Sequence, residues 1–282
     1  MINNNSNLVP KPFFLYGTAW KEEHTARLTQ LALQAGFRGI DTANQRKHYH
    51  ERAVGHGLQV AYESLNLTRN QLWLQTKFTH LAGQDHRLPY DAQAPIAEQV
   101  MSSFESSLAH LQTDYIDAYV LHGPSLSDGL TDKDWAAWEA MEELYNQGKV
   151  KALGVSNVNA MQLRLLLKGC RINPSYVQNR CYAKRGWDQE VRQICSTHQI
   201  RYQGFSLLTA NREIWHSKAL AELSDRHQCT PAEIIFSFAL AVDMLPLTGT
   251  SNPQHMLNDL RSHQDLLSEK ELKLIENISR QH

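Results

Sequence analysis

The segment "YIDAYVLHGPSLSDGLTDKDWAAWEAMEELYNQGKVKALGVSN" (residues 115–157) contains one full repeat of a pattern that runs through the whole chain. A short apolar run (115–122) is followed by a stretch with apolar residues at helical spacing (132–148), and then by a second apolar run (151–157). Short apolar runs with polar borders are typical of strands buried on both faces of a parallel sheet. The segment therefore predicts a strand, a helix and a second parallel strand.

The same alternation extends to both ends of the chain. The other candidate strands are "FFLYGT", "GIDTA", "LWLQTKF", "SYVQNR", "IRYQGFSLL" and "LPLTGT". Further helices are expected over 22–36, where Gly36 is a natural stop, and over 92–111. About eight strand–helix units predict an α/β protein with a single-domain (β/α)8 TIM barrel over residues 1–282, of which 1–9 form a flexible N-terminus. The alternative is a doubly wound open sheet, but no G-x-G-x-x-G follows the first strand.

Composition narrows the class of protein. A formal net charge of -1 over 282 residues gives no reason to expect nucleic acid as a partner. No apolar run reaches the roughly 18 residues that span a bilayer, and the polar start "MINNNSNLVPKP" has no signal core. Four cysteines without a C-x-x-C pair read as free thiols and not as a metal site. We therefore expect a cytoplasmic protein without a membrane partner. Since a single barrel is self-sufficient as a fold, we also expect a monomer or weak dimer.

Polar side chains stand at the carboxyl ends of nearly all the candidate strands. In a (β/α)8 barrel this end of each strand carries the site. The residues in question are Thr18, Asp41, Lys77, His122, Ser156, Asn157, Gln178, Ser206, Thr248 and Thr250. Each of them alone has a structural explanation, such as a helix cap or a buried histidine, but a whole series at one rim predicts a binding or catalytic site.

Four residues form a chemical set if the barrel is correct. A phenol donates a proton poorly near neutral pH because its pKa is about 10. Lys77 beside Tyr49 would lower that pKa, and Asp41 would keep the lysine charged. A neutral His122 would orient a carbonyl oxygen. The set predicts a proton donor for a carbonyl that is being reduced.

Reduction also requires a hydride donor, which no side chain supplies, so a nicotinamide cofactor is implied. Ser156, Asn157 and Gln178 offer hydroxyl and amide groups suited to a carboxamide. Phe205 could stack on the nicotinamide ring, although a lone aromatic after a strand is more often part of the core.

The motifs "GIDTA…Y-x-E…VG", "LQTKF", "LQTDYIDAYVLHGP", "GKVKALGVSN", "YVQNR" and "GFSLL" resemble the aldo-keto reductase superfamily in order and spacing, from about Pro10 to Asp259. The resemblance implies a (β/α)8 barrel and NADP(H) bound without a Rossmann domain. It also implies that Asp41, Tyr49, Lys77 and His122 are catalytic, with Trp20, Tyr49 and His122 at the substrate. The cofactor residues it implies are Gly17, Thr18, Asp41, Ser156, Asn157, Gln178, Phe205, Ser206, Leu208, Thr248, Gly249, Thr250, His255 and Asp259.

Four features depart from the family pattern. Tyr49 lies eight residues after Asp41 instead of five, in a loop with two extra residues that resembles a subgroup with "DTANQRKHYHE". "HGP" lacks the aromatic residue that often precedes the proline, which should widen the pocket. His255 stands where an arginine often binds the adenosine 2′-phosphate, so NAD(H) is an open alternative. Few residues follow Asp259, so the pocket should be open or take its lid from 79–93.

Other functions remain open at this point. The chain could be a nicotinamide-binding regulatory or scaffold subunit of the same fold with little turnover. It could also be a cofactor-free isomerase or lyase with Lys77 as a Schiff-base amine, but this leaves "GVSN" and "YVQNR" unexplained. Finally, Arg46 beside the tyrosine suggests the hypothesis that it draws in an anionic substrate.

Overall fold

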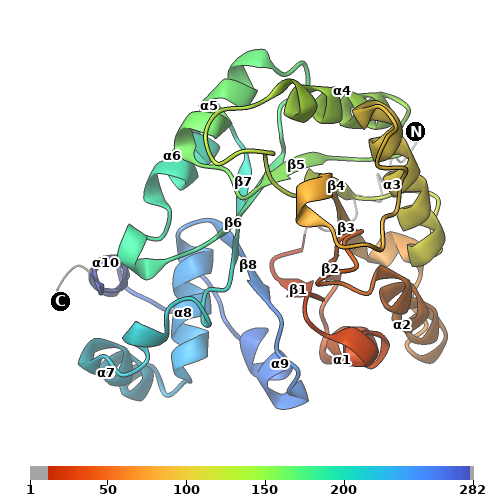
Figure 1. Ribbon diagram of the computed structural model, residues 1–282. Coiled ribbons are helices and arrows are strands. Elements are labelled where there is room, and N and C mark those ends of the chain that lie inside the picture. Colours follow the sequence, from red (N-terminus) through yellow and green to blue (C-terminus); the bar gives the residue numbers. More distant parts are fainter. Residues whose placement is uncertain (1–11, 280–282) are drawn as a thin grey trace, which may run out of the picture.

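The computed structural model describes residues 12–279, so the flexible N-terminus expected over 1–9 lies outside the described residues. The described chain forms a closed barrel of parallel strands in sequence order (Figure 1). The strands are β1 (Leu15–Gly17), β2 (Gly39–Asp41), β3 (Trp73–Phe78), β4 (Ala118–Leu121), β5 (Leu153–Ser156), β6 (Tyr176–Arg180), β7 (Arg201–Phe205) and β8 (Met244–Thr248). Since β8 pairs with β1, the barrel prediction is confirmed and the open-sheet alternative is wrong.

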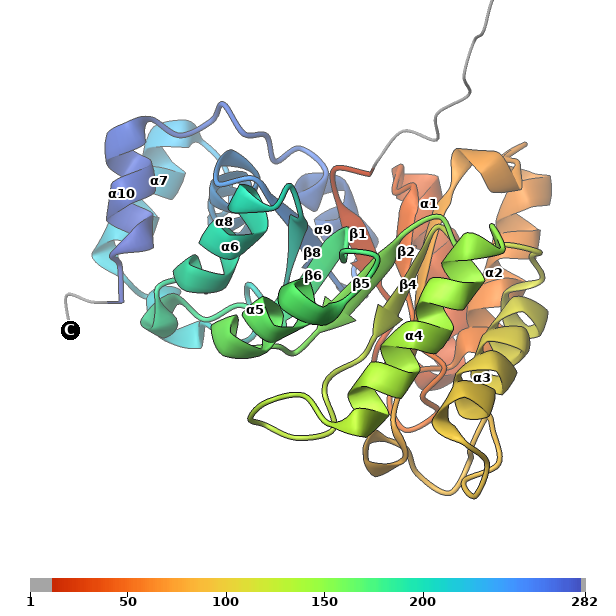
Figure 2. The ribbon, with the colours of Figure 1, turned by 90° about the horizontal axis from the view of Figure 1, so that it is seen from above.

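Helices form an outer layer around the strands (Figure 2). They are α1 (Thr25–Ala35), α2 (Glu51–Ser64), α3 (Ile96–Leu111), α4 (Asp132–Asn146), α5 (Ala160–Gly169), α6 (Gln189–Thr197), α7 (Lys218–His227), α8 (Pro231–Ala241), α9 (Pro253–Asp259) and α10 (Glu269–Glu276). Short 3-10 turns are η1 (Glu22–His24), η2 (Arg69–Gln71), η3 (Leu81–Gly83), η4 (Ala183–Arg185) and η5 (Arg212–Ile214). As predicted, α1 ends at Gly36, whose φ of 115° suits glycine.

Local sequence explains where several helices begin. Thr131, Asn159, Thr230 and Ser268 each form a capping box with the residue three positions later. The cap of α5 is therefore Asn159, and Ser156 and Asn157 do not cap it. The "GHG" at residues 55–57 lies within α2, where a Cβ on Gly55 or Gly57 would overlap a backbone carbonyl of the neighbouring helix. These glycines allow close packing of α2 against α3 and α1.

Side chains close one end of the barrel and leave the other end open. Leu15, Trp73, Ala118, Tyr176 and Leu245 pack together near the amino ends of their strands. The larger apolar core lies between the strands and the helices. A cavity is therefore left at the carboxyl end of the strands, where the polar residues converge.

Two further findings concern the described residues. Over 12–279, no helix is long and apolar enough to cross a bilayer. Within the same range, no group of three or more His, Cys, Asp or Glu is placed to hold a metal, and the four cysteines are free thiols.

Candidate active site

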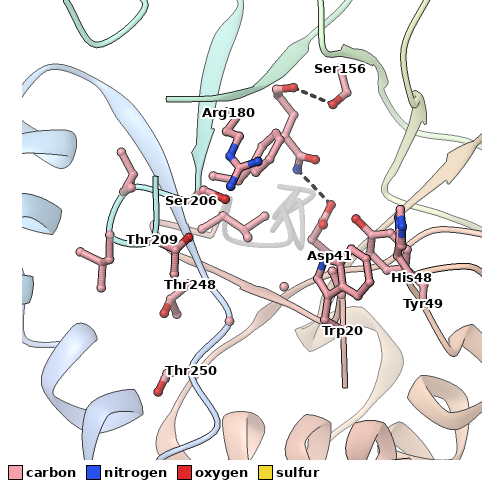
Figure 3. A pocket seen from close by; sticks show the side chains of 18 of the residues that line it. Trp20, Asp41, His48, Tyr49, Ser156, Arg180, Ser206, Thr209, Thr248 and Thr250 are labelled. Carbon is pink, nitrogen blue, oxygen red and sulfur yellow. Dashed lines mark hydrogen bonds between the residues drawn. The ribbon is translucent and has the colours of Figure 1, made fainter. Parts of the chain in front are cut away.

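A cavity of about 660 Å³ opens at the carboxyl end of the strands. Trp20, His48 and Tyr49 line one side of it, and Ser206, Thr209 and Thr248 line the opposite side (Figure 3). Of the residues singled out from the sequence, those that line it are Gly17, Trp20, Asp41, Tyr49, His122, Ser156, Asn157, Gln178, Phe205, Ser206, Leu208, Thr248, Gly249 and Thr250. Barrel closure thus brings most of the predicted residues together.

Asp41 and Lys77 form a buried ion pair beneath the cavity. Asp41 is the last residue of β2, and Lys77 lies near the end of β3. Lys77 Nζ is 2.7 Å from Asp41 Oδ1. Lys77 is 0% exposed, and its ammonium also donates to the Thr42 carbonyl at 2.8 Å. Burial lowers the pKa of Lys77, whereas the adjacent Asp41 carboxylate acts in the opposite direction. Asp41 touches the cavity itself, so the pair connects the barrel interior to the site.

Tyr49 comes from the loop between β2 and α2. Backbone N–H groups of His48 and Tyr49 both donate to the Gln45 carbonyl, which turns the longer loop back toward the barrel. Lys77 Nζ lies 5.2 Å from the centre of the Tyr49 ring, and the Tyr49 and His122 ring centres are 5.8 Å apart. The loop with two extra residues therefore still places Tyr49 beside Lys77 and His122.

The expected lowering of the Tyr49 pKa is wrong. Burial raises the pKa of Tyr49 well above its ordinary value, and the negative charge of Asp41 raises it further. Lys77, whose Nζ lies 5.2 Å from the centre of the Tyr49 ring, does not outweigh these two effects. The phenol consequently stays protonated throughout the physiological pH range.

His122 is neutral, as the sequence analysis requires. Burial, followed by the positive charges of Lys77 and His48, lowers the pKa of His122 to about 3. Its Nδ1 lies 2.7 Å from Thr79 Oγ1. If the threonine hydroxyl donates to Nδ1, the tautomer carries its proton on Nε2, which leaves that N–H available to a carbonyl oxygen.

The hydroxyl and amide groups lie on the β5 and β6 side of the cavity. Ser156 Oγ donates to the backbone carbonyl of Gln178 at 2.6 Å, and Asn157 Nδ2 donates to the backbone carbonyl of His122 at 2.7 Å. Gln178 Nε2 donates to Asp41 Oδ1 at 3.0 Å. Asn157 and Ser206, which both line the cavity, have positive φ angles of 55° and 56°, an uncommon backbone conformation for residues other than glycine.

Several predicted residues lie outside the main cavity. Thr18 is buried, with its hydroxyl donating to the Asp41 carbonyl at 3.0 Å. His255 and Asp259 line an adjoining cavity of about 400 Å³ that shares Leu208 and Thr250 with the first. Burial raises the pKa of Asp259 to about 6. The two cavities adjoin at Leu208 and Thr250, which follow β7 and β8.

Arg46 does not line the main cavity. It lines a separate cavity of about 310 Å³ behind Tyr49, and its guanidinium lies 3.3 Å from Glu22 Oε2. No residue of 79–93 lines the main cavity either, so this segment is not a lid over it in the structure.

Sequence reasoning missed several residues that line the cavity, among them Lys21, His48, Arg180 and Thr209. Lys21 Nζ donates to the Gly249 carbonyl, which links the loop after β1 to the loop after β8. His48 stacks on Trp20, which is 69% exposed, with ring centres 4.0 Å apart. Arg180 ends β6 and could have been found by the rule used for the other strand ends.

Comparisons with known proteins agree with this geometry. A family model described as "Aldo/keto reductase family" matches residues 13–280. A 9,11-endoperoxide prostaglandin H2 reductase of Trypanosoma cruzi is 27% identical over 90% of this chain and 82% of its own length. Glyoxal reductase of Bacillus subtilis is 26% identical over 97% of this chain and 91% of its own length.

The fold is found in solved structures too. An aldo-keto reductase from a Medee basin deep-sea metagenome library aligns with a TM-score of 0.82 over 97% of this chain and 93% of that protein, at 22% identity. At that identity the likeness concerns the fold alone. Members of the family matched by the model use NAD(P)H and act on small carbonyl compounds. Because that match covers nearly the whole chain, the protein belongs to the aldo/keto reductase family and is an oxidoreductase that acts on carbonyl groups.

Proposed function

We propose that the protein reversibly reduces an aldehyde or ketone to an alcohol, with a hydride from NAD(P)H and a proton from Tyr49. The observation that carries this proposal is the convergence of Tyr49, His122 and the Asp41–Lys77 pair on one cavity that Ser156, Asn157 and Gln178 also line. The relatives described above are reductases, and they give no support to the alternative of a regulatory subunit.

The cavity residues fit a nicotinamide. Gln178 uses both hydrogens of its side-chain amide on partners within the barrel, and its side-chain oxygen Oε1 has no donor among the described residues. That oxygen, with Ser156 and Asn157, suits a carboxamide group, and Phe205 lines the same space. When bound, the nicotinamide supplies the hydride that no side chain can supply.

Tyr49 acts as the proton donor in this proposal. Its raised pKa keeps the phenol protonated until the substrate oxygen gains negative charge, and at that stage proton transfer becomes favourable. Lys77, 5.2 Å from the ring centre, stabilises the phenolate that remains. Asp41 keeps the lysine charged despite complete burial.

His122 orients the substrate. Its neutral ring donates a hydrogen bond from Nε2 to the carbonyl oxygen, while the Thr79 hydroxyl donates to Nδ1. The Trp20–His48 stack lines the same side of the cavity as Tyr49 and is the expected contact for the rest of the substrate (Figure 3).

We also propose that the protein uses NADH at least as well as NADPH. The adjoining cavity, where the adenosine end would lie, is lined by His255, Asn258 and Asp259, with no lysine or arginine among its described lining residues. An imidazole beside a carboxyl group is a poor site for a 2′-phosphate, which the planar guanidinium of an arginine binds better. The cytoplasmic location and the monomeric or weakly dimeric state stay predictions.

The test is a titration of the purified protein with NADH and NADPH, followed by tryptophan fluorescence, together with a Tyr49→Phe variant. We expect saturable binding by the wild type and by Tyr49→Phe. Reduction of glyoxal or benzaldehyde should fall about 100- to 10,000-fold in the variant because the general acid is lost. A Tyr62→Phe variant, altered outside the cavity, is the matched control and should keep full activity. If the wild type binds neither cofactor, the proposed function is refuted.

A further inference from the structure

Two fully buried amides lie in the barrel beneath the candidate site. Gln75 in β3 and Gln203 in β7 are both 0% exposed. Branched apolar residues usually fill the interior of a (β/α)8 barrel, and burying an amide is unfavourable unless its hydrogen bonds are made. Neither residue contacts the cavity, and the proposed reaction gives neither a chemical role.

The two amides bond to each other and to residues of the site. Gln75 Nε2 donates to Gln203 Oε1, and Gln203 Nε2 donates back to Gln75 Oε1, both at 2.9 Å. Gln75 Nε2 also donates to Asp41 Oδ1 at 2.6 Å. Gln178 Nε2 donates to Gln203 Oε1 at 2.9 Å and to Asp41 Oδ1 at 3.0 Å. The result is one connected network of three glutamines and one carboxylate.

Only one orientation of each amide lets every donor in this network meet an acceptor. Asp41 is an acceptor, so the NH2 group of Gln75 must face it. The reciprocal pair then forces the carbonyl oxygen of Gln203 toward the NH2 groups of Gln75 and Gln178. If Gln178 were turned over, its oxygen would face the Asp41 carboxylate and the Gln203 oxygen, and both contacts would be repulsive.

The consequence reaches the cavity. With both hydrogens of Gln178 Nε2 engaged below, its carbonyl oxygen is left as an acceptor at the cavity wall. In the same network, Gln75 joins Lys77 and Gln178 as a third donor to Asp41 Oδ1. Gln75 and Gln203 thus determine which end of the Gln178 amide a ligand meets.

We propose that Gln75 and Gln203 are positioning residues that hold the Gln178 amide with its oxygen toward the nicotinamide carboxamide. The inference rests on the proposed nicotinamide-dependent function. It predicts an effect confined to the nicotinamide half of the cofactor, because the adenosine end would lie in the cavity lined by His255 and Asp259.

The experiment uses Gln203→Met and the double variant Gln75→Met/Gln203→Met. Methionine keeps the length of the side chain, and the double variant removes both partners, so no amide of the pair is left unpaired. Gln99→Met, at a buried glutamine of α3 outside the main cavity, is the matched control. Binding of NADH, NADPH and ADP-ribose, which lacks the nicotinamide, is measured for each protein with thermal melting and kcat.

In Gln203→Met and in the double variant, we expect the Kd for NADH and NADPH to rise about tenfold and kcat to fall, while the Kd for ADP-ribose stays within about twofold. Gln99→Met should leave kcat and the Kd values for NADH, NADPH and ADP-ribose unchanged. Equal weakening of ADP-ribose and NADH would indicate a general structural role and overturn the proposal. Unchanged NADH binding and kcat would also overturn it, with the proposed function intact. A wild type that binds ADP-ribose and neither full cofactor would refute both.

Discussion

The carboxyl group of Asp259 should destabilise the folded protein at neutral pH. Asp259 is 2% exposed, accepts a hydrogen bond from Thr248 Oγ1 at 2.8 Å, and faces His255 on its own helix and Glu233 from α8. Burial raises the pKa of Asp259 to about 6, against about 4 for an unperturbed aspartate. Folding therefore favours the protonated form of Asp259. As the pH rises from about 4 to about 6, the free energy of unfolding of the protein falls.

Two pKa units correspond to about 3 kcal/mol in the free energy of unfolding, reached in full above about pH 7. Asp259→Asn removes the charge, and its amide oxygen still accepts from Thr248. We expect the variant to melt about 5–10 °C above the wild type at pH 7.5 and within about 2 °C of it at pH 4.5.

Thermal melting at both pH values, without cofactor, measures this difference. Asp265→Asn, at an exposed carboxyl in the same region, is the control and should shift the melting temperature by less than about 2 °C at either pH. An Asp259→Asn shift of the same size at both pH values would refute the reasoning, as would a variant less stable than the wild type at pH 7.5.

Three further predictions follow from the cavity wall. Thr79→Val removes the hydroxyl at His122 Nδ1 and should lower kcat for carbonyl reduction about tenfold without changing the Kd for NADH; an unchanged kcat would show that Thr79 does not set the tautomer. Lys21→Met removes a cation that lines the main cavity, so it should raise the Kd for NADH about fivefold and weaken the dependence of that Kd on salt. A Kd equal to that of the wild type at low salt would contradict this role. Arg46→Ala should leave the preference between charged and neutral aldehydes unchanged because Arg46 lines a different cavity, so a changed preference would revive the anion-attracting hypothesis.

The barrel was predictable because its signal is local. Each strand and each helix has its own apolar pattern, and a parallel order follows once strands alternate with helices. In the structure these elements are shorter than the apolar patterns predict. β4, for example, covers Ala118–Leu121 within the expected run 115–122, and α1 begins only after the 3-10 turn at Glu22–His24. Ends are set by cap geometry and strand pairing, which an apolar pattern does not encode.

The residues that end the strands were also predictable. One topological rule, that the carboxyl ends of barrel strands share a rim, brings Asp41, His122, Ser156 and Gln178 to one cavity. The rule concerns positions within single strands, so it needs no knowledge of contacts. The rule does not reach Lys21, which lies in the loop after β1, and on β6 it was met by Gln178, two residues before Arg180.

The strand order, the outer helices and the set of polar side chains that meet at the rim could all be read from the amino-acid sequence, because they depend on short-range patterns. The direction of the Tyr49 pKa shift and the orientation of the Gln178 amide, by contrast, became apparent only with the packed barrel. Both depend on burial and on partners distant in sequence: Gln75 and Gln203 are 128 positions apart and meet only because the barrel closes. An amide shows no preferred orientation, and a phenol no raised pKa, until packing excludes water and supplies a neighbour.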